Sequence, residues 1–298
     1  MKVSYKSITA LQAIIPLETP VLFSNLQTNS NSSPLDQFLT NANSINRIYL
    51  SASSTLSPEL GSLVLLGYMS AVESFFRTLV RKLINIDECT RNQVLDRRVT
   101  FGAALHHTAD LLPDALLEDI SFAGKSNIEK MLSDYIGLFG KPPSEIKTAL
   151  DEFHKICELR HCCVHRFGKL GASNAIRLGL DTHSTALEMS FSPSNLQLQE
   201  ISDSLRTFVK ALNNYIFQSV LERTAAHQTY EKLVPSIIWH WKFPTDRRHF
   251  RPYYDLFSSH SDAPASPSLK EIYYSFRDAV QSARRARSAQ KPYKKPST

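Results

Sequence analysis

The feature that most constrains the fold of this chain is a spacing of three, four and seven residues between apolar positions. It first appears after Ser57-Pro58, where serine is a favourable N-cap and proline a favourable first helical residue, and continues to about Ile86. The apolar positions in this stretch are Leu65, Val72, Phe76, Leu79 and Leu83. This is the period of a helix that is buried along one face. The sequence therefore predicts a long core helix here.

Three further stretches have the same period. They are Asn127–Leu138, a stretch that begins at Ser144 and ends at Gly168 and Gly171, and a stretch from Ser192 to about Arg223. Only 9 of the 298 residues are glycine, which argues against a barrel or sandwich with many tight turns. We therefore predict a mainly α fold, a helical bundle of about four long helices.

The regions outside these stretches have a different composition. Ser24–Ser57 is rich in serine, asparagine and threonine and is predicted to be a loop. Ala175–Leu180 alternates weakly and is predicted to be a short strand or an extended crossover. The expected organisation is a partly irregular N-terminal arm over residues 1–55, the helical bundle over 56–225, and an aromatic-rich helical extension with a basic tail over 226–298.

Targeting and redox signals point to the cytoplasm. No long apolar stretch follows the N-terminal residues, and no apolar run approaches the roughly 18 residues needed to span a bilayer. Three of the four cysteines, Cys157, Cys162 and Cys163, crowd into seven residues of one expected helix. That arrangement suits reduced thiols better than a disulfide framework. We predict a cytoplasmic protein with no membrane partner.

The positive charge is concentrated at the C-terminal end. Residues 270–298 hold eight basic and two acidic residues, a net +6 that equals the formal charge of the whole chain. The cations expected to bind nucleic-acid phosphates are Arg284, Arg285, Arg287, Lys291, Lys294 and Lys295. The alternative is a tail that only keeps the protein soluble. The tryptophans before it, Trp239 and Trp241, are expected to pack on the bundle rather than stack on bases.

A group of polar residues stands out on the third expected helix. Arg160 occupies a position in the apolar stripe, where a guanidinium is costly unless an anion meets it. His154, Glu158, His161 and His165 follow one another at steps of four, three and four, so they share a helix face beside Arg160.

Three interpretations of this group are open. It could be a solvated helix face, since histidine is favourable near a helix C-terminus. It could be a metal site, because His161 and His165 are one turn apart and Cys157, Cys162 and Glu158 are close. Zinc usually takes four ligands from two separated groups, however, and the rest of the sequence lacks a second pair with such spacing. A metal site is therefore less expected than a metal-free one, and the spacing alone leaves a solvated face and a metal-free functional centre both open.

The segment Glu158–His165 resembles the R-x4-H motif of the HEPN superfamily, helical bundles that carry arginine, a polar residue and histidine at the end of a late helix. Ala71–Arg77 is similar to the segment of the first long helix in which many of these proteins carry an acidic residue. The resemblance covers roughly residues 56–225. It implies metal-independent RNA cleavage without a cofactor, usually at the interface of a homodimer.

The resemblance also implies roles for individual residues. His165 would be the acid/base, Arg160 would stabilise the phosphate, and His161 would orient the substrate or share in proton transfer. Glu73 would face the bundle and orient Arg160 or a histidine. The alternative for Glu73 is an ordinary surface ion pair with Arg77, four residues later.

The biological setting is expected by analogy alone. The resemblance implies a toxin or an effector of antiviral defence, restrained by a regulatory or antitoxin protein partner. The alternative is a catalytically silent HEPN-like module that serves as an RNA-binding or scaffold subunit of a larger complex.

Overall fold

The computed structural model describes residues 15–24, 32–50, 56–225 and 237–290, with side chains as far as residue 286. The chain divides into two units, residues 1–32 and residues 33–298. In the first unit, Thr19–Leu22 forms the short 3-10 helix η1, which buries no residue. The remaining elements belong to the second unit.

The second unit is helical throughout its described part, which confirms the expected mainly α class. No β-strand is present among these residues, although Lys169 and Ser190 form one isolated bridge. The elements in chain order are α1 Pro34–Leu50, α2 Pro58–Ile86, α3 Glu88–Val94, α4 Phe101–His106, α5 Leu112–Ala115, α6 Lys125–Lys130, the π-helix η2 Met131–Tyr135, α7 Ser144–Arg166, α8 Ala172–His183, the 3-10 helix η3 Ser184–Ala186, α9 Asn195–Ala225, α10 Phe243–Phe257 and α11 Leu269–Gln290.

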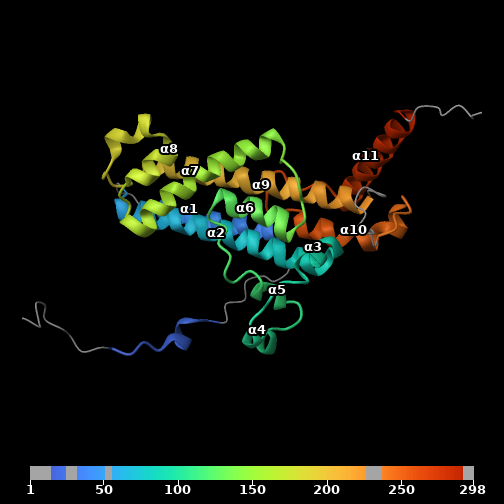
Figure 1. Cartoon of the computed structure of the whole chain (residues 1–298), viewed down its shortest axis with the longest axis horizontal. Coiled ribbons are helices and arrows are strands. Elements are labelled where there is room, and N and C mark those ends of the chain that lie inside the picture. The colour runs from blue at the N-terminus through green and yellow to red at the C-terminus, as the bar shows by residue number, and fades with distance from the viewer. Residues whose placement is uncertain (1–14, 25–31, 51–55, 226–236, 291–298) are drawn as a thin grey trace, which may run out of the picture. The chain divides into compact units, whose positions relative to one another are not determined.

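Helix α2 lies at the centre of this unit. It packs against α1, α7, α9 and α10, as Figure 1 lets the reader follow. All five apolar residues that define its sequence period are fully buried. The N–H of Leu60 donates to the Ser57 hydroxyl at 3.2 Å, so the predicted N-cap is formed. The predicted core helix is therefore confirmed.

Helix α2 is also long and apolar enough, by length and composition alone, to cross a membrane. The sequence analysis did not anticipate this. In the fold, 56% of its most apolar 18-residue window is buried against other parts of the chain. The central helix of a bundle has that kind of burial.

Helix α1 corrects the loop or loosely packed arm predicted for Ser24–Ser57, and it gives the partly irregular arm predicted for residues 1–55 a packed helix. Pro34–Leu50 is a helix packed along α2 and α9, with Phe38, Leu39 and Tyr49 in the core. Serine, asparagine and threonine occupy much of its outer face, which hid the apolar spacing. Pro34 in the first turn, directly after Ser33, is the start signal that could have revealed it.

Two other predicted elements differ from the structure. Asn127–Leu138 is not a long helix but the short α6 followed by the π-helix η2. Ala175–Leu180 is not extended, because it lies inside α8, where Gly179 has a positive φ of 106° and kinks the helix. The second predicted stretch is therefore not a long helix, and α1 is a long helix that the periodicity did not predict.

The C-terminal extension belongs to the same core. Phe250 and Tyr273 are fully buried between α10, α11 and the bundle. The indole N–H of Trp239 donates to the Thr224 hydroxyl of α9 at 3.1 Å, and Trp241 packs against the core from a partly buried position. The expected packing of the tryptophans is confirmed.

The carboxylate of Asp36 ties α1 to the segment after α10. It accepts hydrogen bonds from the Ser259 hydroxyl at 2.5 Å and from the backbone N–H groups of His260 and Ser261 at 3.0–3.2 Å. Burial raises the pKa of Asp36, but these hydrogen bonds lower it by more, so its pKa lies below the ordinary value.

We predict that Asp36→Ala lowers the free energy of unfolding by about 2–3 kcal/mol, because it leaves buried donors without their charged acceptor. Since the folded-state pKa is depressed, the contribution of the carboxylate is present at neutral pH and is lost as the pH falls below about 4. Urea unfolding at pH 7 and pH 3 measures both effects. Asn41→Ala, an exposed change in the same helix, is the control. An equal loss at both pH values would contradict this account.

Candidate anion-binding pocket on α7

A polar pocket of about 540 Å³ lies where α6, α7 and α8 meet. Helix α7 contacts both other helices, and Figure 1 shows α8 folding back beside it. The pocket is lined by Ala123, Gly124, Lys125, Ser126, Glu129, His154, Cys157, Glu158, Arg160, His161 and Arg177. Three basic side chains and two histidines thus face two carboxylates, and this balance favours an anion.

Glu158 fixes the wall between α7 and α8. Its carboxylate is buried and accepts a hydrogen bond from the Asn174 amide at 2.8 Å. Arg177 of α8 donates to the same carboxylate at 3.3 Å, and the His154 ring nitrogen lies 3.9 Å away. The carboxylate therefore satisfies groups of the protein and organises the cations around it.

Arg160 is the cation of this pocket that remains open to an outside anion. Lys125 pairs with Asp151 at 2.5 Å, and Arg177 pairs with Glu158. Within the described residues, the half-buried guanidinium of Arg160 makes no ion pair and no hydrogen bond. The position of Arg160 in the apolar stripe of the sequence predicts an anionic partner for it. The described part of the fold does not supply one.

The structure joins Arg160 to His161 more directly than to His165. Five positions along a helix correspond to a rotation of about 140°, so Arg160 and His165 project from different sides of α7. His165 is exposed and does not line the pocket. His161 does line it, and its ring centroid is 4.4 Å from that of His165. The two imidazoles therefore form a pair that begins at the pocket and continues outward.

Glu73 makes neither of its expected pairings. Its carboxylate accepts a hydrogen bond from the Ser121 hydroxyl at 3.2 Å, and Ser121 in turn accepts from the N–H of Ala123 on the pocket rim. Arg77 instead donates to the carbonyls of Leu117 and Ile120. Together Glu73 and Arg77 hold the segment that leads to the pocket, which makes Glu73 a positioning residue.

The cysteines around the pocket are structural. Burial, with a further contribution from the Glu158 carboxylate, raises the pKa of Cys157 to about 12. Burial also raises the pKa of Cys162 and of Cys163. Among the residues that the structure describes, no group of three or more histidine, cysteine or acidic side chains is arranged to hold a metal ion.

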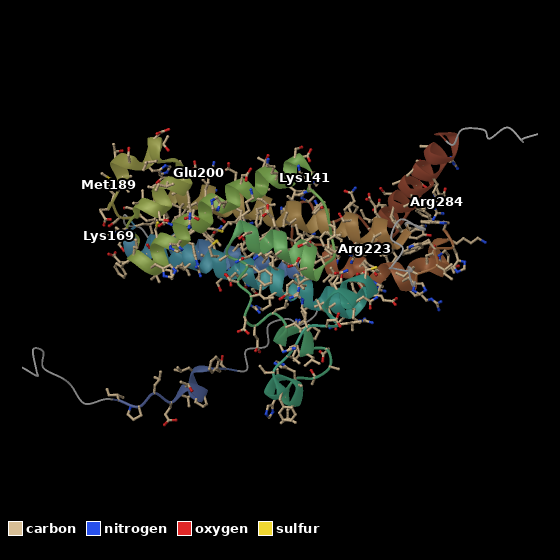
Figure 2. The ribbon with its side chains drawn as sticks, viewed as in Figure 1. Lys141, Lys169, Met189, Glu200, Arg223 and Arg284 are labelled. Atoms are coloured by element: carbon tan, nitrogen blue, oxygen red, sulfur yellow. The ribbon has the colours of Figure 1, made fainter. Side chains whose placement is uncertain are left out.

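Arg284, the first of the expected C-terminal cations, does not line this pocket. Figure 2 shows Arg284 at the opposite end of the bundle from Lys169, which follows α7. Arg284 donates to the Ala225 carbonyl at 3.3 Å and lies 5.1 Å from the Trp241 ring, so it is not the free cation that was expected. Arg285 is exposed. The side chains of Arg287, Lys291, Lys294 and Lys295 lie outside the described part of the chain.

Sequence reasoning missed Lys125, Asn174 and Arg177. The last two lie three residues apart, a spacing that places them on one helix face, but their segment was assigned partly to a strand. Lys125 follows Gly124 in a stretch whose path across α7 is set by tertiary packing. No local signal marked it as a neighbour of Arg160.

No protein-family model, curated protein or solved structure matches this chain. The resemblance to the HEPN superfamily therefore rests on the R-x4-H motif and its place near the end of a long helix.

We predict that Glu158→Ala lowers the free energy of unfolding by about 1–3 kcal/mol, because the buried Asn174 amide loses its acceptor. Arg177→Ala is the matched variant. It removes a partner whose side chain is 53% exposed, so its cost should stay below about 1 kcal/mol. Urea unfolding of both variants measures the difference. Equal losses would show that the carboxylate does not anchor α8 through Asn174.

Proposed function

We propose that this protein is a metal-independent endoribonuclease of the HEPN type, with its centre at Arg160, His161 and His165. The observation that carries the proposal is the unpaired guanidinium of Arg160 in a cationic pocket, beside a histidine whose ring neighbours a second histidine. A guanidinium is well suited to hold a phosphate through two parallel hydrogen bonds. Imidazoles exchange protons near neutral pH.

The reaction needs these two kinds of group. One imidazole takes the proton of a ribose 2′-hydroxyl as its oxygen attacks the adjacent phosphorus. The bond from phosphorus to the 5′-oxygen breaks, and a protonated imidazole gives that oxygen its proton. The products are a 2′,3′-cyclic phosphate and a 5′-hydroxyl. Arg160 stabilises the charge on the phosphorane, His165 serves as acid/base, and His161 shares the proton transfer.

The biological setting of the protein is part of the same proposal. An unrestrained ribonuclease harms its host, so a toxin or defence effector with a regulatory or antitoxin protein partner fits this chemistry. The competing function is a silent RNA-binding or scaffold subunit. It predicts RNA binding by the purified chain without any cleavage.

We predict that His165→Ala reduces cleavage of purified total RNA by on the order of 10²–10⁴-fold, because a proton-transfer group is lost. Arg160→Ala should reduce cleavage by roughly 10²–10³-fold, because the phosphorane loses its stabilising cation. The rates are measured by gel electrophoresis, with EDTA present and absent.

His106→Ala is the control for these variants, since His106 is an exposed histidine of α4. It should cleave like the unaltered protein. Activity abolished by EDTA and restored by zinc would replace this proposal with a metal site. Full activity of His165→Ala would remove the histidine from the mechanism.

We further predict a two-fold homodimer that brings two copies of the motif to one substrate, because in-line transfer uses both an acid and a base. Light scattering of the active protein should give twice the chain mass. A fully active monomer would contradict the dimer.

A further inference from the structure

Helix α7 ends in an unusual conformation. Phe167, directly after the last helical residue, has φ 51° and ψ 44°, the left-handed region that glycine adopts most easily. Its backbone N–H donates to the Cys162 carbonyl and closes the helix. The glycine of this turn, Gly168, follows Phe167 by one residue and so does not relieve the strain at Phe167. The sequence thus places an aromatic residue at a position where helix ends favour glycine.

The Phe167 side chain gains no packing in return. It is 82% exposed and makes no aromatic or cation contact within the described part of the fold. Val164, one turn earlier on α7, is also exposed. A strained backbone that carries an exposed aromatic ring does not stabilise the fold, and such strain is typical of functional positions.

A second residue with a positive φ contacts the turn at the end of α7. Glu188 has φ 62° and pairs with Arg166 at 2.6 Å, and the backbone of Leu170 bonds to that of Glu188 and Met189. The loop before α9 thereby holds the end of α7 in place. Figure 2 shows Lys169 and Met189 together at this end of the bundle. The exposed ring is therefore presented by a braced turn.

The surroundings of the ring favour a polyanion over an apolar protein partner. His165 lies two residues before it and Lys169 two residues after it, and both are exposed. Within the described residues, Lys169 makes no side-chain ion pair. An aromatic face beside a lysine and an imidazole offers base stacking and phosphate contacts, the two interactions with which proteins bind single-stranded nucleic acid.

We propose that Phe167 is a stacking platform for a nucleobase next to the cleaved phosphate, and that the substrate is therefore single-stranded RNA. This inference rests on the proposed ribonuclease function, because the platform adjoins the His161–His165 pair. A base in a duplex is stacked on both faces already and offers no face to the ring. A single-stranded loop or end does.

The test compares Phe167→Gly with Phe167→Trp, both in the His165→Ala background so that RNA stays intact. Phe167→Gly should weaken binding of a labelled single-stranded oligoribonucleotide roughly 5- to 100-fold, yet raise the melting temperature, because glycine relieves the left-handed strain. Phe167→Trp should keep the affinity and add fluorescence quenching on RNA binding beyond that of the two tryptophans of the parent. Phe101→Gly, at an equally exposed phenylalanine of α4, is the control and should leave affinity unchanged.

Each contrary result has a distinct meaning. Unchanged affinity of Phe167→Gly, when the His165→Ala protein binds RNA and the unaltered protein cleaves it, overturns the platform and leaves the ribonuclease proposal standing. A lower melting temperature, or a change of mass in light scattering with unchanged RNA affinity, assigns Phe167 to folding or to a protein interface and also overturns it. If the unaltered protein neither binds nor cleaves RNA, both proposals are wrong.

Discussion

The buried carboxylate of Asp87 connects more helices than any other polar group that we describe. Asp87 ends α2 and caps α3 through a 2.7 Å bond from the Thr90 N–H. It also accepts from the Tyr253 hydroxyl of α10 at 3.1 Å and pairs with Arg223 of α9, whose guanidinium continues to the Ile136 carbonyl. A buried ion pair is costly unless such bonds satisfy it. The two terminal nitrogens of Arg223 are satisfied in this way, while its buried Nε has no hydrogen-bond partner among the described residues, and the pair favours the arrangement of helices in which these bonds form.

The geometry of the pocket on α7 depends on this arrangement of the helices. With α2 fixed in the centre, α7 packs along it, and Glu73 and Arg77 project from α2 to hold the segment between Leu117 and Ala123. That segment forms one rim of the pocket, and α8, held by Glu158, forms another. Arg160 thus lies between two walls that are each attached to the core by a carboxylate. This rigidity is what a site for a fixed anion needs.

Much of the fold could be predicted from the sequence, but the site could be predicted only in part. The α2 residues Leu65 to Leu83 reveal their helix because one face is apolar without interruption. In α1 the polar outer face dominates the composition, and the buried Asp36 reads as a loop residue although it accepts bonds from residues more than 200 positions away. Arg160 and His161 were found because both lie on one element. Lys125 and Arg177 come from other elements, and sequence spacing carries no information about such neighbours.

Helix α9 gives the molecule a length scale. Its 31 residues run from the loop that braces the end of α7 to Ala225, the residue that Arg284 contacts. At about 1.5 Å per residue this is roughly 46 Å. Under the proposed ribonuclease function, a strand has to span about this distance to reach from the end of α7 to Arg284, so its affinity should depend on its length.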